Sequence, residues 1–267
     1  MIEKQLKYLI KSFSLDFAMN LRNSSHELKS MNWNGKKLYY RSSSSDMHLI
    51  YQILLKSRYK AEYFFPNQIN PKTILDIGGN IGITSIFLAK TFPKATIYSF
   101  EPVIDNFEIL KKNTQKYKNI KIFNYGLGSQ NGSFKLYLSK DSENFGGVSL
   151  FPSVGGGTES ESYSNCDVKE INAVIKDINI SSIDLIKIDT EGAEYDILKS
   201  LNDEFMRGVS WITGELHGNR DFELLDYLNN LGFSISMKKP INNSLSMFSA
   251  GKKTIISQMS RKEIRTL

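Results

Sequence analysis

The feature that most constrains the fold is a change of pattern near residue 73, where short apolar strands begin to alternate with amphipathic helical segments. The clearest helix is FELLDYLNNLGF at residues 222–233, with Gly232 as its stop. Strand–helix alternation predicts an α/β fold in which a mostly parallel sheet carries helices on both faces. We predict strands at residues 74–76, 96–100, 120–124, 183–189 and 211–216, with helices after the first, second, fourth and fifth.

A different pattern follows the third predicted strand. GSFKLYL at residues 132–138 and GGVSLF at residues 146–151 predict a β-hairpin. SVGGGTESESYSN at residues 153–165 is rich in Gly and Ser and predicts a surface loop, which is also placed to serve as a lid. We therefore expect a main domain over residues 72–253, with a hairpin and loop insertion near residues 130–166.

The first 71 residues predict a helical cover on this domain, and residues 254–267 form a C-terminal tail. A second helix is expected after SSSSD at residues 42–46, which supplies capping side chains. The first helix has lysines at positions 4, 7 and 11 roughly opposite an apolar stripe of Ile2, Leu6, Leu9, Ile10, Phe13 and Phe17. A basic amphipathic helix of this kind can lie weakly on an anionic membrane surface, but we favour packing against the chain's own domain.

Composition excludes several classes of protein. The 267 residues are enough for one large α/β domain with additions. No apolar run is long enough for a signal peptide or a membrane-spanning helix, and the single cysteine, Cys166, fits a reducing compartment, so we expect a cytoplasmic protein. Three widely spaced histidines argue against a zinc site. The net charge of +6 mildly favours anionic partners, although solubility is the interpretation that we prefer.

The glycine turn ILDIGGNIG at residues 74–82 does not fit the common phosphate-binding motifs. A P-loop requires Gly-Lys-Ser/Thr, but Gly82 is followed by Ile83 and Thr84. A dinucleotide fingerprint requires glycines at i, i+2 and i+5, whereas these lie at 78, 79 and 82. The turn therefore predicts neither a P-loop nor NAD binding.

What remains is an acid before a short glycine turn and a second acid at the end of the next strand. Glu101, in SFEP, can accept both hydroxyls of a ribose, and the turn brings backbone close to a ligand. Together they predict a nucleoside site that fits S-adenosylmethionine, although each glycine alone could simply permit a tight turn. The predicted cofactor-binding residues in this part of the chain are Asp76, Gly78, Gly79, Asn80, Gly82 and Glu101.

Four segments resemble a known family, the FkbM-type S-adenosylmethionine-dependent methyltransferases. They are LDIGGNIGITS at 75–85, YSFEP at 98–102, DLIKIDTEGAEYDIL at 184–198 and GELHG at 214–218, within a match over residues 73–233. The resemblance implies a class I Rossmann-like fold with a seven-stranded sheet, and methyl transfer, usually to a hydroxyl oxygen. It also places Leu127 in the cofactor site, although Ser129 stands where the family has an acid, and Gly79, Asn172 and Ser200 also depart from its pattern.

The predicted catalytic residues lie at the ends of the fourth and fifth predicted strands, where His217 ends the fifth strand on the cofactor side of the sheet. Alignment of the hydroxyl on the methyl group can contribute about 7–11 kcal/mol, and a base adds about 10²–10⁴-fold. We expect His217 to be this base, because an unperturbed pKa near 6.5 leaves it mostly neutral. Glu191 or Glu215 would orient His217 or a sugar hydroxyl. Lys187 shares a strand face with Asp189 and should pair with Asp189 or Glu215, which could also be a purely structural ion pair.

The leading hypothesis is an S-adenosylmethionine-dependent O-methyltransferase that acts on a small molecule or glycan with several hydroxyls. The carboxylates of Asp189, Glu191 and Glu215 could hold a divalent ion, but their spacing does not demand one, so we expect no metal. An RNA ribose 2′-O-methyltransferase is one alternative, although the sequence shows no basic, aromatic-interleaved groove, and we expect no nucleic acid partner. A non-catalytic binding module with the same fold is the other. The sequence leaves the acceptor and the oligomeric state open.

Overall fold

A computed structural model describes residues 2–22, 26–138, 148–149, 163–217, 220–240 and 246–267. Its centre is a seven-stranded sheet in the order β12-β13-β11-β10-β3-β4-β5, with β13 antiparallel to both neighbours and the central pairs parallel. This order confirms the class I, Rossmann-like α/β fold and all five predicted strands. The strands are β3 (Thr73–Ile77), β4 (Thr96–Phe100), β5 (Ile120–Phe123), β10 (Leu185–Ile188), β11 (Trp211–Leu216), β12 (Phe233–Pro240) and β13 (Ser246–Lys252).

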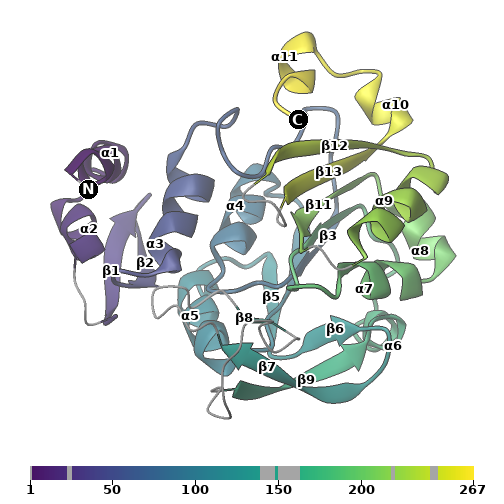
Figure 1. Cartoon of the computed structure of the whole chain (residues 1–267), viewed down its shortest axis with the longest axis horizontal. Helices are drawn as coiled ribbons and strands as arrows, with labels where there is room; N and C mark the ends of the chain where they lie inside the picture. The colour runs from purple at the N-terminus through teal and green to yellow at the C-terminus, as the bar shows by residue number, and fades with distance from the viewer. Residues whose placement is uncertain (1, 23–25, 139–147, 150–162, 218–219, 241–245) are drawn as a thin grey trace.

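Helices cover both faces of this sheet (Figure 1). Because strand side chains alternate, Ile74 and Leu185 face one layer, while Leu75 and Ile186 face the other. The first layer packs with α4 (Ile83–Thr91) and α5 (Ile104–Thr114). The second layer packs with α6 (Ile171–Asp177), α7 (Glu194–Ser200), α8 (Asp203–Gly208) and α9 (Asp221–Asn230). Helices therefore follow the first, second, fourth and fifth predicted strands as expected.

The N-terminal region differs from the wholly helical cover that we predicted. It does contain α1 (Ile2–Ser12), α2 (Leu15–Met19), a 3₁₀ turn η1 (Asn20–Arg22), and α3 (Ser45–Leu49), which continues as the π-helical η2 (Ile50–Leu55). Between them lies an antiparallel hairpin of β1 (Leu28–Trp33) and β2 (Lys36–Arg41). The physical reason is the Asn34-Gly35 turn, where both residues have positive φ, as two-residue hairpins require.

A smaller four-stranded sheet, in the order β6-β9-β7-β8, lies below the first in Figure 1. The pairing of β7 with β8 confirms the predicted hairpin, while residues 153–162 of the Gly/Ser-rich segment fall outside the described residues. The strands are β6 (Gly126–Gly128), β7 (Gly132–Leu138), β8 (Val148–Ser149) and β9 (Tyr163–Glu170).

The C-terminal residues fold back onto the domain through α10 (Lys253–Ile256) and α11 (Arg261–Ile264), at the top of Figure 1. Ser260 and Glu263 form a capping box, and Glu263 also accepts a hydrogen bond from the Asn67 backbone N–H at 2.9 Å. This segment is therefore packed against the N-terminal region. Among the described residues, no helix is both long and apolar enough to cross a bilayer.

Candidate functional site

A cavity of about 330 Å³ opens at the carboxyl ends of β3, β4 and β10. Ligands bind at this edge in open α/β sheets, because the turns that follow parallel strands converge there. Four predicted cofactor residues line the cavity, Gly78, Asn80, Glu101 and Leu127, together with two predicted catalytic residues, Asp189 and Glu191. The apolar walls come from Ile77, Phe100, Pro102, Val103, Val168, Ala193 and Ile197.

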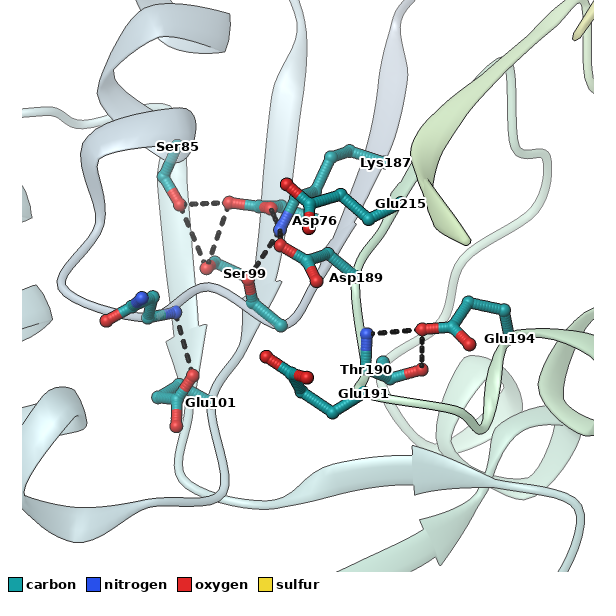
Figure 2. Close-up of polar contacts among 12 residues, drawn as sticks. Asp76, Ser85, Ser99, Glu101, Lys187, Asp189, Thr190, Glu191, Glu194 and Glu215 are labelled. Atoms are coloured by element: carbon teal, nitrogen blue, oxygen red, sulfur yellow. Dashed lines mark hydrogen bonds and ion pairs between the residues drawn. The ribbon is translucent and has the colours of Figure 1, made fainter. Parts of the chain in front are cut away.

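Glu101 is held at this cavity by the backbone. Its Oε2 accepts a hydrogen bond from the Asn80 N–H at 2.7 Å, and its Oε1 accepts one from the Val103 N–H at 2.8 Å. A carboxylate has about four acceptor positions, and those not used by Asn80, Val103 and the Asn106 side chain remain for ligand hydroxyls. Burial raises the pKa of Glu101 to about 7, and the hydrogen bonds from Val103 and Asn80 only partly offset this rise. Figure 2 shows the contact with the glycine turn.

The glycines of the turn have packing reasons of their own. Gly78 has a φ of +82°, and a Cβ there would lie 1.9 Å from the Asp189 carbonyl oxygen, so the turn passes directly against the end of β10. Gly82 has a φ of +85° and begins α4, where a Cβ would lie 3.2 Å from the Thr114 side chain. A Cβ on Gly79 would lie 2.3 Å from Ser99 Oγ. Of these three glycines, only Gly78 lines the cavity.

Asp76 lies behind the cavity in a buried ion pair. Lys187 Nζ lies 3.6 Å from Asp76 Oδ1 and 3.7 Å from Asp189 Oδ2, and it donates a 2.6 Å hydrogen bond to the Gly78 carbonyl. Ser85 Oγ donates to Asp76 Oδ2 at 2.5 Å. Burial would lower the pKa of Lys187, but the surrounding carboxylates, Asp189 first, outweigh it and raise the pKa. The expected ion pair between Lys187 and Asp189 is present. Asp76 also supports the glycine turn, because it pairs with the Lys187 ammonium that bonds to Gly78.

His217, at the end of β11, lies among four carboxylates. Its Nδ1 is 3.0 Å from Glu194 Oε1. Its Nε2 faces Glu191 Oε2 at 3.4 Å, Asp189 Oδ1 at 3.6 Å and Glu215 Oε2 at 3.8 Å. The imidazole side chain is only 7% exposed, so these charges act on it through little solvent. The structure therefore gathers all the predicted catalytic side chains except Lys187 around one ring.

This environment overturns the expectation that His217 is mostly neutral. Burial alone would lower its pKa, but the hydrogen bond to Glu194 and the charge of Asp189 raise it to about 10. The ring is then an imidazolium at neutral pH. Burial and Asp189 raise the pKa of Glu191 to about 8, and Asp189 and burial do the same for Glu215. Within the carboxylates around His217, the groups that exchange protons closest to neutral pH are therefore Glu191 and Glu215.

Glu191 is presented to the cavity by a strained turn. Its φ of +58° lies in the left-handed region, and Gly192 follows with a φ of +113°. A non-glycine residue in this region costs about 1–3 kcal/mol and is found preferentially at functional sites. Figure 2 shows the Glu191 carboxylate projecting into the space between Glu101 and Asp189. The strain is consistent with a carboxylate that is positioned for a ligand.

Glu194 is a site residue that sequence reasoning did not select, because its place in the helix after the fourth predicted strand suggested only a support for that turn. It is only 3% exposed and accepts hydrogen bonds from the Thr190 N–H at 2.8 Å and the Gly192 N–H at 3.1 Å, besides its contact with His217. His217 lowers the pKa of Glu194 although burial acts against this. The orienting partner of His217 is thus Glu194, where we expected Glu191 or Glu215. The signal in the sequence was a second acid three residues after Glu191.

The same cluster contains a possible set of metal ligands. Asp189, Glu215 and His217 each offer one ligand atom, and the three atoms lie within 4.8 Å of one another. Oxygen and imidazole ligands at this separation suit a divalent cation, although acidic groups also cluster without one.

The chain is similar to several known proteins. The family described as Methyltransferase FkbM domain matches residues 76–235. The chain is 25% identical over 184 residues to Methyltransferase 1 of Beauveria bassiana, covering 62% of this chain and 74% of that protein. It is 27% identical over 150 residues to the hexuronic acid methyltransferase AglP of Haloferax volcanii, covering 55% of this chain and 56% of that protein. Methyltransferase FkbM from Methylobacillus flagellatus KT superposes with a TM-score of 0.45 at 17% identity, covering 67% of this chain and 43% of that one.

Proposed function

Because the chain belongs to the FkbM methyltransferase family, we propose that it transfers a methyl group from S-adenosylmethionine to a hydroxyl oxygen of a saccharide or similar polyhydroxylated metabolite. The observation that supports this best is the pairing of two sites across one cavity. Glu101 stands on one side as an acceptor for ribose hydroxyls, and Glu191 and Asp189 stand on the other as acceptors for a sugar hydroxyl.

The residues around the cavity fit the cofactor. A buried carboxylate with free lone pairs suits a ribose, and the apolar walls around Leu127 suit an adenine ring. Asn80 Oδ1 is buried and has no hydrogen-bond partner among the described residues, which leaves an acceptor for a ligand N–H. We infer that Gly78, Asn80, Glu101 and Leu127 contact the cofactor directly, while Asp76, Gly79 and Gly82 shape the turn.

The acidic cluster would bind and deprotonate the acceptor. S-adenosylmethionine supplies an electrophilic methyl group on a sulfonium, so the protein must align the acceptor oxygen and remove its proton. Glu191 lines the cavity and has a pKa near neutrality, which suits a general base. His217, fixed by Glu194, would stabilise the ionised cluster as an imidazolium. This replaces the neutral His217 base that the sequence predicted.

A saccharide acceptor is supported by the chemistry of the cluster and by one relative. Carboxylates accept hydrogen bonds from hydroxyls, and several of them on one wall can orient a polyol. AglP, whose name describes a hexuronic acid methyltransferase, is 27% identical over its matched segment. RNA is disfavoured, because the cations that line described grooves do not line the cavity. One such groove, with Lys56, Arg58, Lys90 and Lys94, lies by the residues that precede β3 and β4, at the opposite ends of the strands from the cavity. Another is lined by Lys36, Lys37, Lys112 and Lys116.

The test is a methyl-transfer assay with isotope-labelled S-adenosylmethionine and a panel of neutral oligosaccharides, uronates and RNA, read by mass spectrometry. We expect the label on a saccharide hydroxyl, and its loss in Glu191→Gln. The matched control is Glu204→Gln, an exposed acid in α8. Labelled RNA with unlabelled sugars would favour the ribose methyltransferase. Cofactor binding without turnover on any acceptor, including cell-extract glycans, would favour a non-catalytic module.

A further inference from the structure

Helices α1 and α2 are anchored to the rest of the N-terminal region by aromatic side chains on their inner side. Tyr8 is 2% exposed and stacks on Tyr51 with ring centroids 4.5 Å apart. Phe17 is fully buried, and its ring meets Tyr40 edge-on at 5.0 Å. These contacts fix which faces of the two helices point outward, at the left edge of Figure 1.

The outward faces carry exposed large apolar side chains, which together we call the apolar ridge. Leu6, Ile10 and Phe13 follow one another at helical spacing on α1 and the turn after it, and Leu15 and Met19 do so on α2. Four of them are between 52% and 62% exposed, and Phe13 is 92% exposed. The sequence pattern predicted that the stripe of the first predicted helix packs on the domain. Among its side chains whose burial is described, Phe17 is fully buried and Leu9 is partly buried, whereas Leu6, Ile10 and Phe13 are exposed.

Phe13 forms the tip of the ridge, between the two helices. Its φ of +53° is left-handed, and its N–H donates to the Leu9 carbonyl at 2.9 Å, so the turn is ordered by hydrogen bonding and by the Ser14 cap of α2. A bulky residue in this conformation is uncommon, and here it gains no packing in return. An aromatic ring that is held outward at a turn is suited to insertion into an apolar environment outside the protein.

Cations lie on the same helix as the first part of the ridge. Lys4 and Lys11 are exposed on α1, and Lys7 pairs with Glu3 at 2.6 Å. The lysines outnumber the two acids of the segment, Glu3 and Asp16. Long lysine side chains can keep their ammonium groups among lipid headgroups while neighbouring apolar side chains enter the acyl region.

We propose that the apolar ridge is a peripheral membrane-binding surface for bilayers that contain anionic lipid. The position and charge of the two helices support this occupant. Helices α1 and α2 lie at an outer edge of the molecule (Figure 1), and the exposed lysines of α1 match negatively charged headgroups. Binding would be weak and reversible, because few side chains insert. It is independent of the proposed methyl transfer and would hold the enzyme at a lipid surface.

The test is sedimentation of the whole protein with vesicles of phosphatidylcholine alone or mixed with phosphatidylglycerol. We expect binding to the mixed vesicles that weakens with salt, and about 10-fold or greater loss in Ile10→Ser/Phe13→Ser. The matched control is Phe222→Ser, which changes an 85% exposed phenylalanine on α9 and should bind as the wild type does. Both variants remove exposed side chains, so thermal melting should show intact folds.

Three results would overturn the proposal. They are no sedimentation with mixed vesicles, equal losses in the ridge and control variants, and concentration-dependent dimerisation by light scattering that the ridge variant abolishes while lipid binding stays absent. The last outcome would assign the ridge to a second copy of the chain.

Discussion

Glu101 allows the sharpest test of the cofactor site, through the variant Glu101→Ala. If the carboxylate accepts two ribose hydroxyls, the variant loses two charge-assisted hydrogen bonds worth about 1.5–3 kcal/mol each. The affinity for S-adenosylmethionine and its demethylated product should then fall by about 10²–10⁴-fold. Because alanine also removes the acceptor for the Asn80 and Val103 N–H groups, Glu101→Gln is needed beside it to keep one acceptor oxygen in place.

The pH dependence of binding separates a cofactor role from a structural one. Burial raises the pKa of Glu101 to about 7 in the free protein, and a ribose favours the ionised form. A carboxyl must lose its proton to act, so affinity should be highest above pH 7 and fall as the pH drops through it. The loss should approach about tenfold per pH unit for one proton. In Glu101→Gln this dependence should vanish.

Isothermal titration calorimetry at several pH values measures both effects, with Glu204→Gln as the exposed control and thermal melting as the check on folding. The ribose assignment is wrong if Glu101→Ala binds the cofactor as tightly as the wild type. It is also wrong if Glu101→Gln keeps the wild-type pH dependence.

Four further outcomes are expected. The wild-type rate should rise with pH towards about 8, where Glu191 ionises, and Glu191→Gln should lower turnover by about 10²–10⁴-fold; a flat pH profile would contradict a carboxyl base. His217→Ala should lower turnover but leave cofactor affinity, measured by calorimetry, nearly unchanged. The pKa of Glu215 is raised from 4.5 in the unfolded chain to about 8 in the folded protein. Its contribution to the free energy of unfolding is therefore largest below pH 4.5 and is lost as the pH rises towards 8. Glu215→Gln should weaken the dependence of the melting temperature on pH in this range. Gly82→Val should lower the melting temperature, because a β-branched residue is strained at a φ of +85°, and a wild-type melt would refute this.

Local patterns in the sequence were sufficient for the main elements. Apolar runs bounded by turn residues determine β3, β4 and β10, because these central strands must be buried on both faces. The glycine turn was equally readable, since positive φ at Gly78 and Gly82 is a local requirement. The β1–β2 hairpin was readable too, from Asn34-Gly35, but the helical periodicity around it concealed that signal.

Only the tertiary structure decided the electrostatics of the site. Glu194 and His217 are 23 residues apart in the chain, and their contact depends on β10 and β11 lying side by side in the sheet. The charge state of His217 depends on how many carboxylates surround it and how little water screens them, and no spacing of residues encodes either. Exposure of Phe13 has the same origin, because an amphipathic pattern identifies an apolar face but not whether the folded domain has a surface to cover it.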